Sequence, residues 1–125
     1  MARGRVTDER LAVARAALEV ARERGESVLD TGREYATGEP VRVFLRRRGH
    51  RWDFGDGGRA VELAGKPDGW LPVAERVVAE EGMNVNRAGV VFVPGVERPG
   101  RDLAALALRL GDVSHTVFAE LVELE

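Results

Sequence analysis

Residues 41–54 constrain the fold of this chain more than any other segment. The apolar residues Val41, Val43 and Leu45 stand at every second position, which is the period of a strand with one buried face. Gly49-His50 then offers a two-residue turn with glycine first, as a type II′ turn requires. The resulting hairpin has four predicted pairs: Arg48 with Arg51, Arg47 with Trp52, Arg46 with Asp53, and Leu45 with Phe54. A slip of one residue would expose the aromatic residues, so burial should fix this register.

The outward side of this predicted hairpin is strongly basic. Residues 41–52 hold five arginines and no acid, and the register places four of them on one face together with an aromatic ring. The candidate nucleic-acid-binding residues are therefore Arg42, Phe44, Arg46, Arg48 and Arg51. Proteins that bind single strands combine cationic side chains with an exposed aromatic ring on which bases stack. The alternative is a solvated face whose arginines pair with acids such as Glu34, Glu39 and Asp53, and exposed pairs of this kind contribute little to stability. The same register sets Arg47 beside Trp52, as in a cation–π pair.

The remaining chain predicts helices and short strands around the hairpin. A first helix spans residues 8–24, with Thr7 or Asp8 at its start and Gly25 at its end. The other predicted elements are an extended segment over 28–35, a short helical turn over 60–63, a helix over 70–81, strands over 83–86 and 90–94, and a final helix from about 99–102 to 125. The order α-β-β-β-α-β-β-α predicts one α+β domain over residues 1–125. Its antiparallel sheet, with the basic hairpin, is packed by N-terminal, middle and long C-terminal helices.

A succession of features in the middle of the chain resembles a known family. The hairpin ends in Trp52-Asp53-Phe54, and an Asp-Gly-Gly turn follows at residues 56–58. Next come an apolar helix, a glycine, a pair of short strands and a closing helix of leucine and valine. Over roughly residues 28–124 this order resembles an uncharacterised bacterial and prophage family, the domain of unknown function numbered eighteen twenty-eight. The arginine-rich hairpin departs from that pattern, and the family has no assigned activity, so the resemblance implies no chemistry.

Composition excludes several classes of protein. Cysteine is absent, which removes disulfides, thiolate metal sites and cysteine nucleophiles. The longest stretch without a charged residue is nine residues, 88–96, whereas a membrane helix needs about 20 apolar residues. The first ten residues carry charges with no apolar segment behind them, unlike a secretory signal. We therefore expect a cytoplasmic domain with no membrane partner.

Candidate catalytic groups are few. The two histidines lie far apart in the sequence, and neither has a second histidine at the spacing of metal ligands. Three carboxylates, Asp53, Asp56 and Glu62, could gather round a magnesium ion, which needs only one or two protein oxygens. They define a metal-assisted hydrolase as one hypothesis. The competing interpretation is that Asp53 pairs with Arg46 across the hairpin and Asp56 stabilises the turn. We assign no catalytic residue, metal site or cofactor from the sequence.

The final helix carries a broad apolar arc, because leucine and valine recur at steps of three and four. The simplest interpretation is packing on the sheet. The alternative is that part of the arc forms a homodimer seam, with the candidate interface residues Leu106, Leu110, Val113 and Val117. Gly111 inside this helix indicates a kink or a close approach of another segment.

The function that these patterns favour is a non-enzymatic binding or accessory module. We expect it to bind a protein partner, which the sequence does not identify, and to associate with itself. Nucleic-acid binding through residues 41–54 is the first alternative, and the metal-assisted hydrolase that uses Asp53 and Asp56 is the second.

Overall fold

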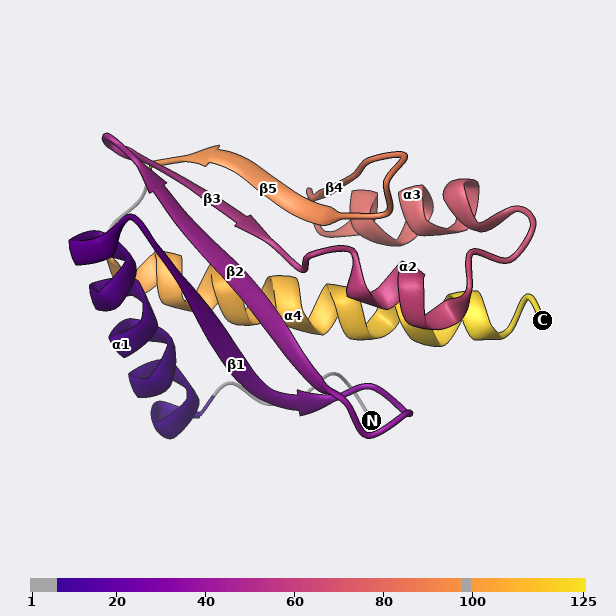
Figure 1. Ribbon diagram of the computed structural model, residues 1–125, viewed down its shortest axis with the longest axis horizontal. Helices are drawn as coiled ribbons and strands as arrows, with labels where there is room; N and C mark the ends of the chain where they lie inside the picture. The colour runs from indigo at the N-terminus through magenta and orange to yellow at the C-terminus, as the bar shows by residue number, and fades with distance from the viewer. Residues whose placement is uncertain (1–6, 98–99) are drawn as a thin grey trace.

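The computed structural model describes residues 7–97 and 100–125 of the chain. Its elements are α1 (Asp8–Arg24), β1 (Glu26–Glu34), β2 (Pro40–Arg48), β3 (Arg51–Gly55), α2 (Arg59–Ala64), α3 (Trp70–Glu80), β4 (Asn84–Val85), β5 (Val91–Val96) and α4 (Gly100–Val122) (Figure 1). The predicted α+β class is confirmed, and the expected helical turn after the hairpin is the short helix α2.

The strands form a five-stranded sheet in the order β1-β2-β3-β5-β4, with every neighbouring pair antiparallel. The hairpin of β2 and β3 has the predicted register, since the observed pairs include Arg48 with Arg51, Arg47 with Trp52, Arg46 with Asp53 and Leu45 with Phe54. Gly49 has a φ of 60° at the first turn position, a conformation that glycine adopts without strain. Local alternation and one glycine therefore account for this part of the fold.

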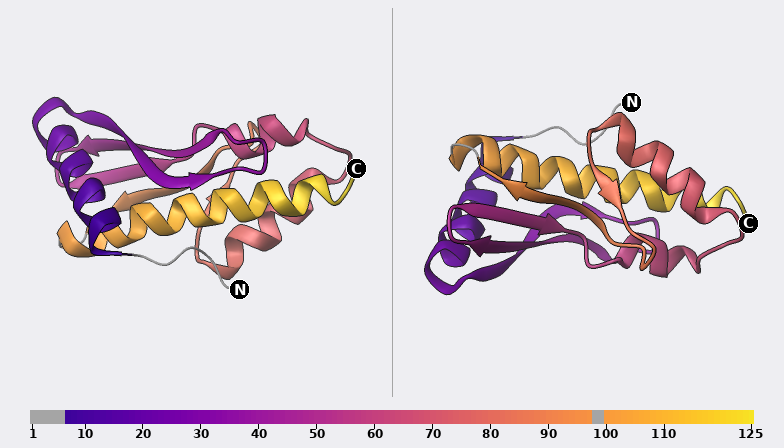
Figure 2. Two further views of the ribbon diagram at one scale, coloured as in Figure 1. Left: turned by 90° about the horizontal axis from the view of Figure 1, so that it is seen from below. Right: turned by 90° about the horizontal axis from the view of Figure 1, so that it is seen from above.

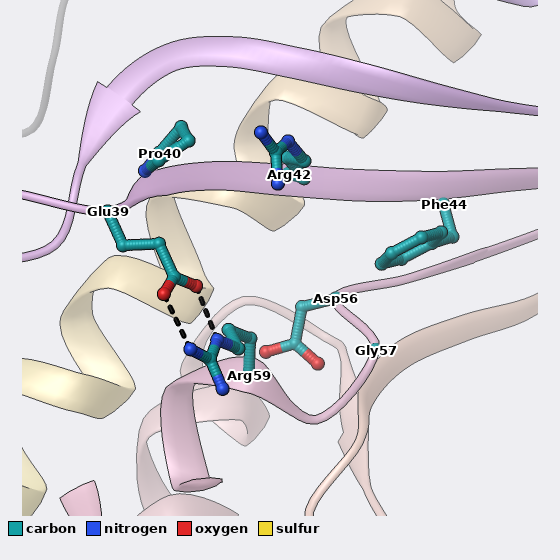
Figure 3. Close-up of a pocket in the computed structure, with 7 residues that line it drawn as sticks. All are labelled: Glu39, Pro40, Arg42, Phe44, Asp56, Gly57 and Arg59. Atoms are coloured by element: carbon teal, nitrogen blue, oxygen red, sulfur yellow. Dashed lines mark hydrogen bonds and ion pairs between the residues drawn. The ribbon is translucent and has the colours of Figure 1, made fainter. Parts of the chain in front are cut away.

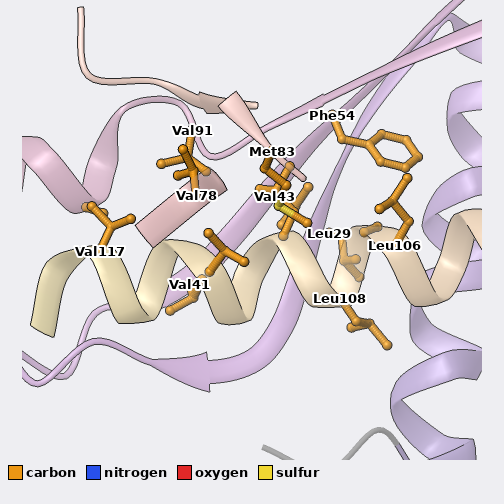
Figure 4. Packing of buried hydrophobic residues seen from close by; sticks show 14 of the residues in the cluster. Leu29, Val41, Val43, Phe54, Val78, Met83, Val91, Leu106, Leu108 and Val117 are labelled. Carbon is orange, nitrogen blue, oxygen red and sulfur yellow. The ribbon is translucent and has the colours of Figure 1, made fainter. Parts of the chain in front are cut away.

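Helices cover one face of the sheet. Helix α4 runs along that face, with α1 beside one of its ends and α3 beside the other (Figures 1 and 2). Side chains from the inner face of the sheet, among them Leu29, Val43 and Phe54, pack against α4 in the core (Figure 4). On β2 the other residues, Arg42, Phe44 and Arg46, are exposed in strict alternation with the buried ones. The opposite face, called here the open sheet face, is therefore turned to solvent.

The broad apolar arc of α4 is explained by its central position. Besides the sheet, this helix contacts α1, α2 and α3, so its apolar residues meet protein over most of the helix circumference. The four candidate interface residues are among them: Leu106, Leu110, Val113 and Val117 are only 0–4% exposed. They lie inside the protein's own core and are not available on the surface as a seam for a second copy.

Gly111 marks a close approach between α4 and β1. A Cβ atom on Gly111 would lie 2.6 Å from the Cγ2 methyl of Thr31. Thr31 is itself buried, and its hydroxyl donates a hydrogen bond to the carbonyl oxygen of Val41 at 2.8 Å, which holds the methyl in place. Of the two expectations for Gly111, the close approach of another segment is the one that this contact shows, and α4 continues as a single helix through residue 111.

Candidate binding site on the open sheet face

An aromatic ring lies in the middle of the open sheet face. Phe44 is 46% exposed although it occupies the centre of a nine-residue strand. It pairs with Val28 of β1, which is 50% exposed, and with Gly55 of β3. Gly55 in turn pairs with Phe92 of β5. An apolar row, Val28, Phe44, Gly55 and Phe92, thus crosses four of the five strands, and the ring of Phe44 in this row is about half uncovered.

The Asp-Gly-Gly turn supports one side of the Phe44 ring. A Cβ atom on Gly57 would lie 2.7 Å from Cε2 of Phe44, so the ring occupies space that a side chain at residue 57 would need. Gly57 also has a φ of 71°, which favours glycine for a second reason. The ring is therefore held in position by backbone on one side while its other side stays exposed.

Opposite charges flank the apolar row on neighbouring strands. In the β1–β2 register, Glu26 lies opposite Arg46, and Asp30 lies opposite Arg42. All four side chains are exposed. Across the residues that the structure describes, neither arginine takes part in an ion pair within 4 Å. The open sheet face thus has an acidic column on β1 and a basic column on β2, each interrupted by an apolar residue.

The basic residues at the far end of the hairpin are neutralised within the chain. Arg48 Nε lies 2.8 Å from Asp53 Oδ2, and Arg51 Nε lies 3.5 Å from Glu97 Oε2. The predicted partner of Asp53 was wrong, because its carboxylate meets Arg48 diagonally across the hairpin instead of Arg46. The backbone N–H of Gly95 donates to the same carboxylate at 3.0 Å, which fixes its direction.

The cation beside Trp52 also differs from the prediction. Arg22 of α1 places its guanidinium 5.8 Å from the centre of the Trp52 ring. Arg47 instead donates from Nε to the carbonyl oxygen of Gly49 at 3.0 Å. The ring of Trp52 is buried on the inner face of the sheet, where α1 packs and supplies the Arg22 guanidinium.

A hollow of about 140 Å³ lies beside Phe44, at the end of the open sheet face. Its lining residues are Glu39, Pro40, Arg42, Phe44, Asp56, Gly57 and Arg59 (Figure 3). Arg59 donates from both Nε and Nη2 to Glu39, and from Nη1 to Glu62 at 2.6 Å. These bonds lower the pKa of Glu39 and raise that of Arg59. Arg59 already has two acidic partners, whereas Arg42, the other cation that lines the hollow, forms no ion pair with residues 7–97 or 100–125.

Asp56 lines this hollow but is almost fully buried, and its oxygens accept hydrogen bonds. Oδ1 accepts from the backbone N–H groups of Gly58 at 2.8 Å and Val91 at 2.9 Å. Oδ2 lies 2.7 Å from the hydroxyl of Ser114, which lies 2.7 Å from the hydroxyl of Tyr35. Burial raises the pKa of Asp56, an effect that the Ser114 hydrogen bond opposes, and burial also raises the pKa of Tyr35 to about 12. This buried chain of polar groups joins the turn to β5, α4 and the end of β1.

The geometry gives the metal hypothesis no support. Asp53 is paired with Arg48, Glu62 is paired with Arg59, and Asp56 is used by the buried hydrogen bonds. Within residues 7–97 and 100–125, no group of three or more histidine, aspartate or glutamate side chains could hold a metal ion. The interpretation of Asp56 as a residue that stabilises the turn fits these contacts.

The comparisons with known proteins give no match: no family model fits the chain, and no curated protein or solved structure is significantly similar to it. The resemblance of residues 28–124 to the uncharacterised bacterial family therefore stays a prediction. In the described part of the chain, no helix is long and apolar enough to cross a membrane. The fold and site define an α+β domain with one open, mixed-charge sheet face.

Proposed function

We propose that this domain is a non-enzymatic protein-interaction module that associates with itself, and that it does so through the open sheet face. The observation that carries the proposal is Phe44, a half-exposed aromatic ring flanked by two arginines that form no ion pair with any residue that the structure describes. The centres of protein interfaces are enriched in aromatic residues and arginine. Rigidly held aromatic residues near the centre also carry a large share of binding energy. The proposal keeps the cytoplasmic location and the bacterial or prophage family expected from the sequence.

The charges on this face favour a protein over a nucleic acid as the partner. Binding to a phosphate backbone depends on cations that are free to replace counterions. Here Arg48 and Arg51 already have acidic partners, and the formal net charge of the chain is −2. The acidic column on β1 would repel phosphates beside the basic column. A protein surface with both signs of charge fits this face better.

Nucleic-acid binding remains the second candidate because of one specific observation. Phe44 lies between Arg42 and Arg46 on the same face, and this arrangement of a ring between free cations suits base stacking. Fluorescence anisotropy with labelled single-stranded DNA, double-stranded DNA and RNA tests it at low and moderate salt. Affinity that falls steeply with salt and is lost on Arg42→Ala/Arg46→Ala would favour this candidate over the protein interface.

Sedimentation velocity over a wide range of protein concentration tests the proposed function. We expect the wild type to form a dimer, and Phe44→Ser to shift the chain to a monomer. Two rings are lost per dimer, and each contributes about 1–1.5 kcal/mol when half of it is buried, so the dimer should weaken about 30- to 150-fold. Val13→Ser is the matched control, because Val13 is 48% exposed on α1, away from the open sheet face.

Two results would contradict the proposal. One is a wild type that stays monomeric up to millimolar concentration. The other is a dimer that Phe44→Ser leaves intact. Because Phe44 is about half exposed on a sheet face outside the core, the variant should keep the circular dichroism spectrum of the wild type and still unfold cooperatively, which separates lost association from lost folding.

A further inference from the structure

The residues of the acidic and basic columns lie at the same positions along the strand direction of the open sheet face. Along β1 the outward residues are Glu26, Val28 and Asp30, and along β2 the residues directly opposite are Arg46, Phe44 and Arg42. Along each strand the outward residues are therefore a charged residue, an apolar residue and a second charged residue. The charges on β1 are negative and those on β2 are positive. Neither arginine forms an ion pair with its neighbour on β1 in the described chain, so both signs of charge are available to a partner.

We propose that the partner of this face is a second copy of the chain, packed sheet against sheet about a two-fold axis that runs parallel to the strands between β1 and β2. This inference rests on the proposed function and specifies its partner and arrangement. A rotation about such an axis leaves the position of every residue along the strand direction unchanged. It places β1 of one copy over β2 of the other. It sets Glu26 over the partner's Arg46, Asp30 over the partner's Arg42 and Val28 over the partner's Phe44. Face-to-face packing with nearly aligned strands is a common arrangement of two sheets.

Other symmetric arrangements of the same surface bring like charges together. A two-fold axis across the strands would set Arg42 over the partner's Arg46, and an axis along β2 would set each arginine over its own copy. Pairing of two β1 edges about Val28 would put Glu26 opposite the partner's Asp30, and like charges directly opposite destabilise a strand pair. Like-charge contacts across an interface cost several kcal/mol. Of the four arrangements, the axis between the two strands is the one that makes every charge contact favourable.

The shape of the surface also suits a second sheet. The hollow lined by Arg42 and Asp56 lies on one side of Phe44. A second hollow on its other side is lined by Glu26, Ser27, Val28, Leu45 and Arg46. The ring is thus a ridge between two depressions, and apolar side chains from two such faces can interdigitate as they do in a sheet sandwich.

Charge reversal tests this arrangement. The acidic variant is Arg42→Glu/Arg46→Glu, and the basic variant is Glu26→Arg/Asp30→Arg; all four positions are exposed. In a homodimer of either variant, like charges would face each other in every charge contact. The dimer dissociation constant should therefore rise at least about a hundredfold. An equimolar mixture restores opposite charges in both contacts and should form a one-to-one heterodimer in sedimentation velocity. A chain with all four reversals is again self-complementary and should form a homodimer.

The outcomes separate this inference from the proposed function. A wild-type monomer overturns both. A wild-type dimer that Phe44→Ser dissociates, but that neither charge-reversed variant weakens, leaves the proposed function standing and overturns the arrangement. Weakened variants that fail to associate when mixed, although their circular dichroism spectra are native, also overturn it.

A cross-linking experiment covers the case in which a reversed variant does not fold. The chain has no cysteine, so Glu26→Cys and Arg46→Cys each introduce a single exposed thiol and keep Phe44. A short bismaleimide should link a mixture of the two more efficiently than either variant alone, because the axis sets residue 26 over residue 46 of the partner. Equal linking in all three samples would overturn the arrangement.

Discussion

Replacing Ser114 by alanine should destabilise the protein more than a typical single change in a helix. The Ser114 hydroxyl is fully buried and lies 2.7 Å from both Asp56 Oδ2 and the Tyr35 hydroxyl. With the carboxylate accepting from Ser114, the Tyr35 hydroxyl donates to Ser114. The change to alanine removes a donor from a buried carboxylate and an acceptor from a buried phenol at the same time.

The expected loss follows from the two broken hydrogen bonds. A hydrogen bond to a charged group contributes about 1.5–3 kcal/mol, and a neutral buried donor left without a partner costs about 1–3 kcal/mol. Alanine recovers about 0.5 kcal/mol through its higher helix propensity. We therefore expect Ser114→Ala to lower the free energy of unfolding by about 2–5 kcal/mol. Tyr35→Phe keeps the edge contact of the ring with Phe118 and removes only the neutral bond, so it should cost about 1 kcal/mol.

Urea unfolding followed by circular dichroism measures these losses. In a double-mutant cycle, Tyr35→Phe/Ser114→Ala should cost about 1–2 kcal/mol less than the sum of the single changes, because phenylalanine leaves no phenol without a partner. The reasoning is refuted if Ser114→Ala costs no more than Tyr35→Phe, or if the two changes are additive. Either result would mean that the three groups do not act as one hydrogen-bonded chain.

Three further predictions concern the pH dependence and the core. Burial raises the pKa of Asp56, so the native state holds this proton more tightly than the unfolded chain. The stability of the wild type relative to Asp56→Asn should therefore fall as pH rises from about 4 through the raised pKa and then level off, as urea unfolding at a series of pH values would show; a constant difference would contradict it. Gly111→Ala should cost about 1–3 kcal/mol through its clash with Thr31, and Thr31→Ser, which removes the clashing methyl but keeps the hydroxyl, should restore most of that loss in thermal melts. Leu110→Glu should unfold the chain as seen by circular dichroism, because Leu110 is fully buried and an unpaired charge there has no partner; a folded monomer would contradict the central position of α4.

The parts of the fold that were predictable depend on residues close together in the sequence. The hairpin register follows from alternation and one turn, both contained within residues 41–54. The role of α4 depends instead on distant elements. A broad apolar arc shows how much of a helix is buried but not by what. Here α1, α2 and α3 provide the cover that the alternative interpretation of the sequence assigned to a second copy.

The candidate site was only partly predictable for the same reason. The outward placement of Arg42, Phe44 and Arg46 follows from the strand period, and the structure confirms it. The partners of Asp56 do not follow from any local spacing, since Ser114 is 58 residues away in the sequence. The actual partner of Asp53 is Arg48 because long side chains on a twisted hairpin also reach diagonally.

The composition of the open sheet face is better explained by binding than by stability. Exposed ion pairs contribute only about 0–1 kcal/mol, and Arg42 and Arg46 do not form even these within the described residues. A single exposed apolar side chain is ordinary. Phe44, however, pairs with an exposed valine on β1, and its ring packs against Gly57, where any other residue would place a Cβ atom in the way. The folded monomer covers about half of the Phe44 side chain, so the exposed half contributes to stability only where another surface buries it. The held ring and the free charges around it therefore contribute most when a second surface covers them.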